Sequence, residues 1–152
     1  MIPKFRVWDT FDEDMVNDIF FSWQDSGYES LNECLSDERW KFMQSTGLFD
    51  KNGKEIFEGD VVKFNDTWAE HDYEGCVDGA SEGENFTEII KTEDGFSFGR
   101  TKIPESSLFD FLNDEHMKFS EIVKSDDFNM VIIGNIYQNP ELLEETNEQA
   151  TT

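Results

Sequence analysis

Hydrophobic and polar residues alternate most regularly between Trp40 and Phe64, a stretch that contains turn residues at Asn52-Gly53 and Gly59-Asp60. A period of two predicts β-strands. Asn-Gly favours a tight hairpin turn, because both residues tolerate a positive φ. Gly59-Asp60 predicts a sharp corner between two strands, which can bend a sheet into a small barrel. We therefore interpret Asn52, Gly53, Gly59 and Asp60 as structural turn residues.

The N-terminal segment predicts a strand over residues 4–8, followed by a stretch that has two interpretations. A helical spacing, which would place the side chains on one face of a helix, is shown by Phe11, Met15, Ile19 and Trp23. Alternatively, residues 9–14 form a turn and residues 15–21 return as a second strand. Periodicity alone leaves both interpretations open.

Residues 65–88 lack a regular hydrophobic pattern. They contain eight acidic residues, three glycines and no lysine or arginine. Such a composition is typical of segments that bury little apolar surface. The sequence therefore predicts a long, mobile, acidic loop, inserted into the barrel over residues 65–85.

The second half of the chain combines strand patterns with one short helical pattern. In chain order we expect a strand over 86–91, a turn at 93–95, a returning strand over 96–98, a short helix that begins near Pro104, a buried strand over 128–137 and a helical turn over 141–145. The polar residues that follow, to Thr152, predict a disordered tail.

The length of 152 residues fits a single domain. We place this domain at residues 1–140, with the barrel formed mainly by 40–64 and 86–140, and with a helical turn and disordered tail at 141–152. No apolar run approaches the roughly 20 residues of a membrane span, and the opening residues lack the apolar region of a signal peptide. Two cysteines are too few for a disulfide scaffold. We expect a soluble, intracellular protein with reduced thiols.

Charge narrows the classes of partner. The chain has 35 acidic and 12 basic residues, a net charge of −23. Such a surface would repel nucleic acid and anionic membranes, since binding to either depends on lysine and arginine. A basic protein is the natural electrostatic partner. The alternative is that the charge only keeps the protein soluble.

Most of the net negative charge comes from two acidic segments, residues 11–38 and residues 65–88. If they fold together, they would form a broad negative face that could imitate the phosphates of DNA. The candidate face consists of Asp12, Glu13, Asp14, Asp18, Asp66, Glu70, Asp72, Glu74, Asp78, Glu82 and Glu84.

Sequence motifs for nucleotides and metals are incomplete. Residues 47–54 differ from a phosphate-binding loop, because the glycines are one residue too far apart and Glu55 replaces the required Ser or Thr. A calcium loop that starts at Asp78 would need a bidentate Glu where Ile89 stands. The four residues that could ligate zinc lack the paired spacing of zinc ligands; they are Cys34, His71, Cys76 and His116. We therefore expect no catalytic residue, no metal site and no cofactor.

Three blocks of the chain follow a pattern known from one family. They are residues 1–9 (MIPKFRVWD), residues 44–62 (QSTGLFDKNGKEIFEGDVV) and residues 133–143 (IGNIYQNPELL). In this order they resemble the YopX family of phage and prophage proteins. The resemblance implies a mainly β protein with little helix, an SH3-like barrel built from the middle and last blocks, and an N-terminal β-hairpin. It thereby favours the strand interpretation of residues 15–21, and it implies no catalytic residues.

These observations lead to two hypotheses. The first is a non-enzymatic phage or prophage accessory protein of the YopX type, which acts by protein–protein interaction in the cytoplasm of the bacterial host. The second is an acidic DNA mimic that inhibits a host defence or DNA-processing enzyme, of the anti-restriction or anti-CRISPR type. In both, the expected partner is a basic host or phage protein. The open edges of a small barrel would also permit a homo-oligomer.

Overall fold

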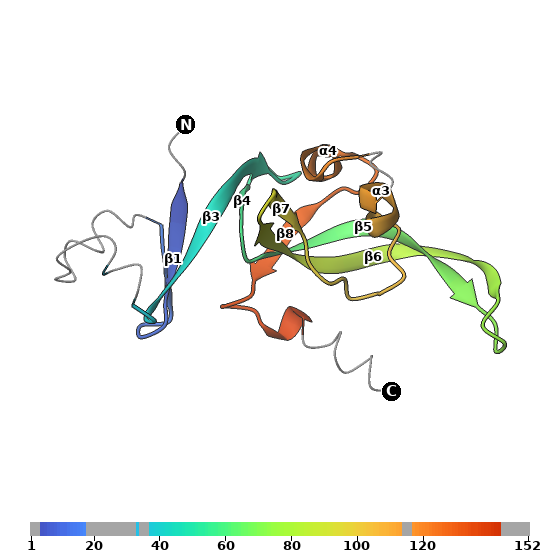
Figure 1. The fold of residues 1–152 in the computed structure, drawn as a ribbon, viewed down its shortest axis with the longest axis horizontal. Coiled ribbons are helices and arrows are strands. Elements are labelled where there is room, and N and C mark those ends of the chain that lie inside the picture. The colour runs from blue at the N-terminus through green and yellow to red at the C-terminus, as the bar shows by residue number, and fades with distance from the viewer. Residues whose placement is uncertain (1–3, 18–32, 34–36, 114–116, 144–152) are drawn as a thin grey trace.

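The computed structural model describes residues 4–17, 33, 37–113 and 117–143, and these residues are mainly β, as predicted. Two four-stranded antiparallel sheets follow one another along the long axis of the molecule (Figure 1). The strands are β1 (Phe5–Asp9), β2 (Asp14–Val16), β3 (Trp40–Phe49), β4 (Glu55–Phe57), β5 (Asp60–His71), β6 (Val77–Thr92), β7 (Gly95–Phe98) and β8 (Val131–Asn135). The two short helices are α3 (Leu108–Asn113) and α4 (Phe119–Lys124).

The first sheet has the strand order β2-β1-β3-β4. Val7 in β1 is paired with Val16 on one side and with Phe42 on the other. The N-terminal β-hairpin is therefore confirmed for the described residues, and over residues 11–16 the helical interpretation is wrong. The remaining residues of the predicted second strand, 18–21, lie outside the described part of the chain.

The turn at Asn52-Gly53 connects β3 to β4, but it is wider than a two-residue turn. The Asp50 amide donates to the Lys54 carbonyl at 2.9 Å, and the Gly53 amide donates to the Asp50 carbonyl at 3.0 Å. Of the two central residues, only Gly53 has a positive φ, +81°. A type I turn followed by one left-handed residue has this geometry. The Asp50 carboxylate completes it by accepting hydrogen bonds from the amides of Asn52 and Lys54, both at 2.9 Å.

The corner at Gly59-Asp60 carries the chain from the first sheet into the second. Gly59 has a φ of +87°, a conformation that glycine adopts without strain. Its amide donates to the Ile89 carbonyl at 2.8 Å, and its carbonyl accepts from the Ile136 amide at 2.9 Å. The predicted corner is thus present, and it is bonded to β6 and to the segment after β8.

The second sheet has the strand order β7-β6-β5-β8 and curls into a half-barrel. The SH3-like barrel itself stays a prediction. The strand predicted over 128–137 is observed as β8, which pairs with the first residues of β5. The predicted turn at 93–95 is also observed, since β7 returns along β6 with Thr92 opposite Gly95.

The prediction of a long loop over residues 65–88 is wrong. These residues continue β5 and β6. The pairing of the two strands begins with Val61 opposite Glu88 and extends outward until His71 stands opposite Val77. The composition is misleading here, because exposed strand positions accept carboxylates without burying charge and the partner strand supplies the backbone hydrogen bonds. We call residues 65–85 the arm, since they project beyond the rest of the molecule (Figure 1).

The main core lies between the second sheet and the two helices. It consists of Ile56, Val62, Phe64, Ile89, Phe98, Leu108, Ile122, Val123, Phe128 and Met130. The helix predicted near Pro104 begins at the fully buried Leu108. The helix α4 is not among the predicted elements; in it, Phe119 packs on Phe98 with ring centroids 4.8 Å apart.

The C-terminal segment follows the prediction as far as it is described. Residues 141–143 form a helical turn after Pro140, and the predicted disordered tail lies outside the described residues. Within the ranges given above, no helix has the length and apolar composition needed to cross a membrane.

Candidate functional site

The arm is a two-stranded ribbon whose residue pairs alternate between two faces. Thr67 and Glu82 are paired on one face, and Trp68 and Ser81 are paired on the other. The neighbouring strands β8 and β7 pair only with the bases of β5 and β6. Among the described strands, the outer edges of the arm therefore have no further pairing partner.

The tip of the arm exposes apolar side chains on an ordered turn. Tyr73 is 96% exposed and Val77 is 68% exposed. Asp72 fixes the turn, because its Oδ1 accepts hydrogen bonds from the amides of Glu74 at 2.9 Å and Cys76 at 3.0 Å. An exposed tyrosine with a fixed backbone is the kind of side chain that anchors protein interfaces.

Trp68 lies across the arm, over Gly83. A Cβ atom at position 83 would stand 2.8 Å from Cη2 of the indole, so glycine leaves the room that the ring occupies. An aromatic ring that covers a strand glycine stabilises the local pairing. The half-buried Trp68 thus gives the arm a packed position outside the main core.

Asp66 holds the base of the arm and is only 5% exposed. Its Oδ1 accepts hydrogen bonds from the Thr67 amide at 2.8 Å, the Ser107 hydroxyl at 2.7 Å and the Ser107 amide at 3.1 Å. Its Oδ2 accepts from Asn85 Nδ2 at 2.9 Å. The Asn85 side chain also donates to the Ile103 carbonyl and accepts from the Ile103 amide. This network ties the segment before α3 to both strands of the arm.

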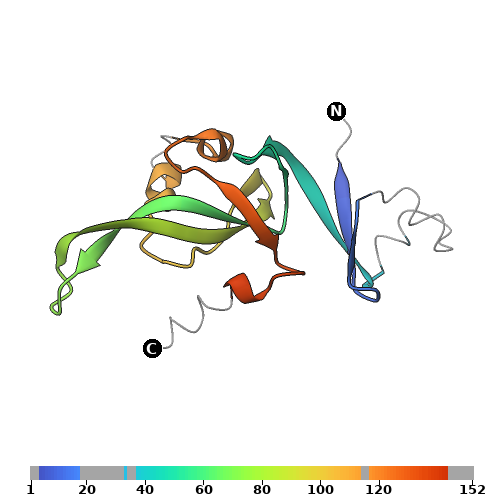
Figure 2. The same ribbon diagram turned by 180° about the vertical axis from the view of Figure 1, so that it is seen from behind.

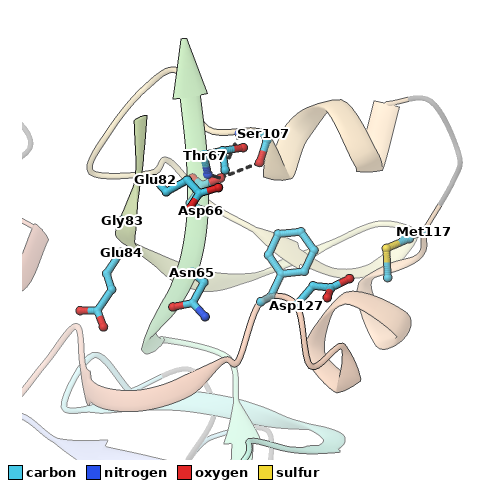
Figure 3. A pocket seen from close by; sticks show the side chains of 10 residues that line it. Asn65, Asp66, Thr67, Glu82, Gly83, Glu84, Ser107, Met117 and Asp127 are labelled. Carbon is cyan, nitrogen blue, oxygen red and sulfur yellow. Dashed lines mark hydrogen bonds between the residues drawn. The ribbon is translucent and has the colours of Figure 1, made fainter. Parts of the chain in front are cut away.

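An open hollow of about 600 Å³ lies where the arm meets the helical part of the molecule (Figure 3). It is lined by Asn65, Asp66, Thr67, Glu82, Gly83, Glu84, Ser107, Met117, Asp127 and Phe128. Asp66 and Ser107 are bonded to each other at one side, while Met117 and Asp127 stand at the other (Figure 3). Every charged residue in this lining is acidic.

The structure does not bring the predicted acidic residues together on one face. Asp12, Glu13 and Asp14 lie at the hairpin between β1 and β2, at the opposite end of the molecule from the arm (Figures 1 and 2). Asp18 lies outside the described residues. On the arm, the exposed carboxylates belong to Glu70, Glu74, Asp78, Glu82 and Glu84.

Two of the predicted acidic residues serve the fold instead. The assignment of Asp66 to the acidic face is wrong, because its carboxylate is buried and its oxygens already accept hydrogen bonds from protein donors. Asp72 is half-buried and caps the turn at the tip. The sequence does not show the role of Asp66, because Asn85 and Ser107 come from distant segments. The role of Asp72 is local, since its partners are Glu74 and Cys76; it is missed because the segment is interpreted as an irregular loop.

A buried ion pair at the junction between the two sheets is also missed by the sequence analysis. Arg6 is 7% exposed, and its Nη2 donates to Asp60 Oδ1 at 2.5 Å. Asp60 Oδ2 accepts from the Phe57 amide at 2.8 Å, and the guanidinium lies 4.7 Å from the centre of the Phe57 ring. Burial raises the pKa of Asp60, and the charge of Arg6 only partly offsets this effect. The sequence gives no signal for this pair, because Arg6 stands at a polar position of the alternating strand over residues 4–8.

A second ion pair fixes the N-terminal hairpin. Arg39 donates from Nε to Asp9 Oδ1 and from Nη2 to Asp9 Oδ2, both at 2.8 Å. These bonds lower the pKa of the buried Asp9 to about 2. The Arg39 guanidinium also lies 4.5 Å from the centre of the Trp40 ring. The arrangement is structural, since it joins the end of β1 to the start of β3.

Metal-binding side chains do not gather in the part of the chain that the structure describes: no group of three or more His, Cys, Asp or Glu residues is placed to hold an ion. Of the residues weighed as zinc ligands, Cys76 is exposed at the tip of the arm. Cys34, His116 and the side chain of His71 are outside the described part.

The three sequence blocks that carry the family resemblance meet at the junction. Arg6 from the first block, Asp60 from the second and Asn135 from the third line one small pocket. The sequence model of one family, described as YopX protein, matches residues 4–144. The chain belongs to the YopX family.

The YopX resemblance is thereby confirmed over nearly the whole chain. The structure of this YopX protein is similar to the crystal structure of protein EF1440 from Enterococcus faecalis, with a TM-score of 0.53 and 28% sequence identity. The similarity covers 94% of this chain and 99% of that chain. No curated protein matches the sequence.

Proposed function

We propose that this protein is a non-enzymatic accessory protein of a phage or prophage, which acts in the host cytoplasm by binding a basic protein through the arm. Membership of the YopX family, which is not a known enzyme family, supports the accessory role. The observation that carries the proposal is a projecting hairpin that bears exposed carboxylates and no lysine or arginine between residues 65 and 88.

The tip of the arm combines the two features that a protein interface needs. Tyr73 and Val77 offer apolar surface for a partner to cover. Glu74 and Asp78 stand beside them and are exposed. Carboxylates around an apolar anchor select a positively charged partner and speed its association, an effect that salt screens.

The hollow at the base of the arm extends this surface. Met117 and Phe128 provide apolar contact area, and Glu82, Glu84 and Asp127 provide negative charge at its edges. A lysine or arginine side chain has the matching form, with an apolar stem and a cationic end. The arm and hollow together therefore suit a partner segment that carries several basic residues.

Affinity capture from host lysate tests this function with two variants of equal charge change. The arm variant combines Glu74→Gln, Asp78→Asn and Glu82→Gln, all at exposed positions. The control combines Asp12→Asn, Glu13→Gln and Asp14→Asn at the opposite end. We expect the wild type and the control to capture a basic protein at low salt, and the arm variant to lose it. Equal capture by all three proteins would contradict the proposal.

The captured protein then distinguishes simple binding from DNA mimicry. Glu82 and Glu84 are two residues apart in β6, so their carboxylates lie in a row on the same face of the strand. A protein that imitates the phosphates of DNA needs acidic groups in such a row. If mimicry is the function, the partner is a nuclease, restriction enzyme or polymerase, and double-stranded DNA displaces the acidic protein from it. If DNA does not displace the acidic protein from its partner, mimicry is excluded and the accessory role is retained.

A further inference from the structure

The arm has an edge, along β6, whose backbone groups point away from β5. Two hydrogen bonds at the base of the arm show this. The Asn65 amide donates to a carbonyl in the segment before β8 at 2.6 Å, and the Thr67 carbonyl accepts from an amide in the segment before α3 at 3.1 Å. In an antiparallel ladder, a residue whose backbone groups point outward stands opposite another residue of the same kind. Since Asn65 is opposite Glu84 and Thr67 is opposite Glu82, the backbone groups of both glutamates also point outward.

This edge of β6 is covered only at its base. β7 and the segment after it follow the edge as far as Phe86, whose carbonyl accepts from the Lys102 amide at 2.9 Å. The next outward residues are Glu84, Glu82 and Ala80, and all three are exposed. Within the described residues, no hydrogen bond joins their backbone groups to another segment. Each residue has one N–H donor and one C=O acceptor, so the edge presents a row of unused donors and acceptors.

The opposite edge of the arm, on β5, is shorter. The backbone groups of Asn65 and Thr67 on that edge already have partners. The register then shifts between Glu70 and His71, which interrupts the regular strand. Only Ala69 lies between these two places. An added strand therefore has more bonds to gain on β6 than on β5.

The side chains along the β6 edge determine which strand it can accept. Glu82 and Glu84 are exposed and lie on the same face, and the Glu84 carboxylate is 3.6 Å from the Lys63 ammonium. A second copy that paired through this edge would place a carboxylate opposite or diagonal to a carboxylate, which destabilises a ladder. Charged side chains protect edge strands against self-association in this way. The same charges favour a strand that carries positive side chains.

We propose that an extended basic segment of the partner adds to the edge of β6 as an antiparallel strand, with lysine or arginine at alternate positions opposite Glu82 and Glu84. Directly opposite Cβ atoms in such a ladder are about 4.5 to 5.5 Å apart, close enough for ion pairs. The residue between the basic positions is opposite Gly83, on the face where the Trp68 indole lies, so an apolar side chain fits there. Main-chain hydrogen bonds supply affinity and the alternate side chains supply specificity. This inference rests on the function proposed for the arm and specifies how the partner binds.

Synthetic peptides test this geometry on the whole chain. The probe is a short capped peptide of alternating lysine and valine, in which the lysine backbone would face β6 and the valine backbone would face away. One control peptide is N-methylated at its lysines and another, to the same extent, at its valines, so that charge and composition are equal. We expect lysine methylation to weaken binding by about tenfold or more, because donors are lost and the methyl groups clash with β6. Valine methylation should leave the affinity nearly unchanged. Equal affinities of the two methylated peptides overturn the proposal.

Amide hydrogen exchange shows which edge the peptide occupies. The unmethylated peptide should slow exchange at the outward amides of Ala80, Glu82 and Glu84. The outward amide of Ala69, on the β5 edge, should be unaffected. Protection at Ala69 alone, or at neither edge, contradicts strand addition to β6.

Two proline variants form a matched pair in the protein. Ala80 and Ala69 stand opposite each other in the arm, and both amides point outward. Ala80→Pro removes a donor from the β6 edge without breaking a bond of the ladder, and Ala69→Pro does the same on β5. We expect Ala80→Pro to weaken peptide binding about tenfold and Ala69→Pro to leave it unchanged. The nuclear magnetic resonance signal of the Trp68 indole checks that the arm stays folded in both. Equal weakening by the two variants, or none by either, overturns the proposal.

Capture from host lysate separates this inference from the function on which it rests. If the arm variant loses the basic protein and Ala80→Pro loses it too, both proposals are supported. If the arm variant loses the protein but Ala80→Pro retains it, the arm is the interface and strand addition is wrong. If the arm variant retains the protein, the proposed function itself is wrong, whatever the peptides show.

Discussion

Asn85 donates a hydrogen bond from Nδ2 to Asp66 Oδ2 at 2.9 Å, and both side chains are buried. The bond crosses the base of the arm, between β6 and β5. Through the other oxygen of Asp66 it reaches Ser107, just before α3. The direction of the arm therefore depends on a polar network at its base as well as on the core.

The first prediction concerns that network. Asp66→Ala leaves donors of Asn85, Ser107 and Thr67 without their acceptor, so we expect it to lower the free energy of unfolding by about 2 to 4 kcal/mol. Glu82→Ala, at an exposed position on the same ribbon, should cost less than about 0.5 kcal/mol. Urea denaturation of both variants measures the difference. Similar small losses in the two variants would show that the network contributes little.

The second prediction concerns the packing of Trp68 on Gly83. The methyl group of Gly83→Ala would meet the indole, and we expect a loss of about 1 kcal/mol from the displacement. In a Trp68→Ala background the same change should cost almost nothing, because the ring is gone. A double-mutant cycle gives the coupling energy, and amide exchange on the arm shows where protection is lost. Additive effects would mean that the ring can move aside freely.

The third prediction compares two glycines with nearly equal φ. Gly53→Ala and Gly59→Ala both place a side chain in the left-handed region, at a cost of about 1 to 2 kcal/mol. At Gly59 the new Cβ would also stand 3.1 Å from Met43 Sδ, whereas space is open around Gly53. We therefore expect the Gly59 variant to be the less stable by about 1 kcal/mol in thermal unfolding. The reverse order would contradict the assignment of Gly59 as the crowded corner.

The fourth prediction concerns acid. Hydrogen bonds from Arg39 lower the pKa of Asp9 to about 2, below its ordinary value of 3.8. Folding thus favours the ionised form, so its contribution is complete above pH 3.8 and is lost as the pH falls through about 2. We expect the wild type to have a higher free energy of unfolding than Asp9→Asn at neutral pH. This difference should shrink by about 1 to 2 kcal/mol on acidification. Because all other carboxylates titrate in both proteins, the difference isolates Asp9; a constant difference would refute the effect.

The sequence predicts those parts of the fold that depend on local residues. The alternation after Trp40 and the glycines at 53 and 59 predict strands and corners, because strand faces and positive φ values are encoded locally. The arm is not predicted, since each of its strands is acidic and its order comes from pairing with the other strand. The N-terminal hairpin is predicted by the family resemblance, because periodicity alone does not decide between a helix and a strand there.

The candidate sites depend on long-range contacts that no local pattern contains. Arg6 and Asp60 are separated by 54 positions, and Asp66 and Ser107 by 41. Composition correctly indicates an acidic surface but assigns Asp66 to it, because burial of a carboxylate depends on donors from other segments. The outward edge of β6 is likewise visible only after its pairing with β5 is known.

Site-specific photo-crosslinking in host bacteria tests the central claim, that the arm is the contact surface, most directly. A photoreactive amino acid replaces Tyr73 at the tip of the arm or, as a control, Phe49 at the end of β3; both side chains are exposed. We predict a crosslink to a basic protein from position 73 only, and its loss when Glu74, Asp78 and Glu82 are neutralised. Absence of a crosslink from position 73, or the same crosslink from position 49, would contradict the account.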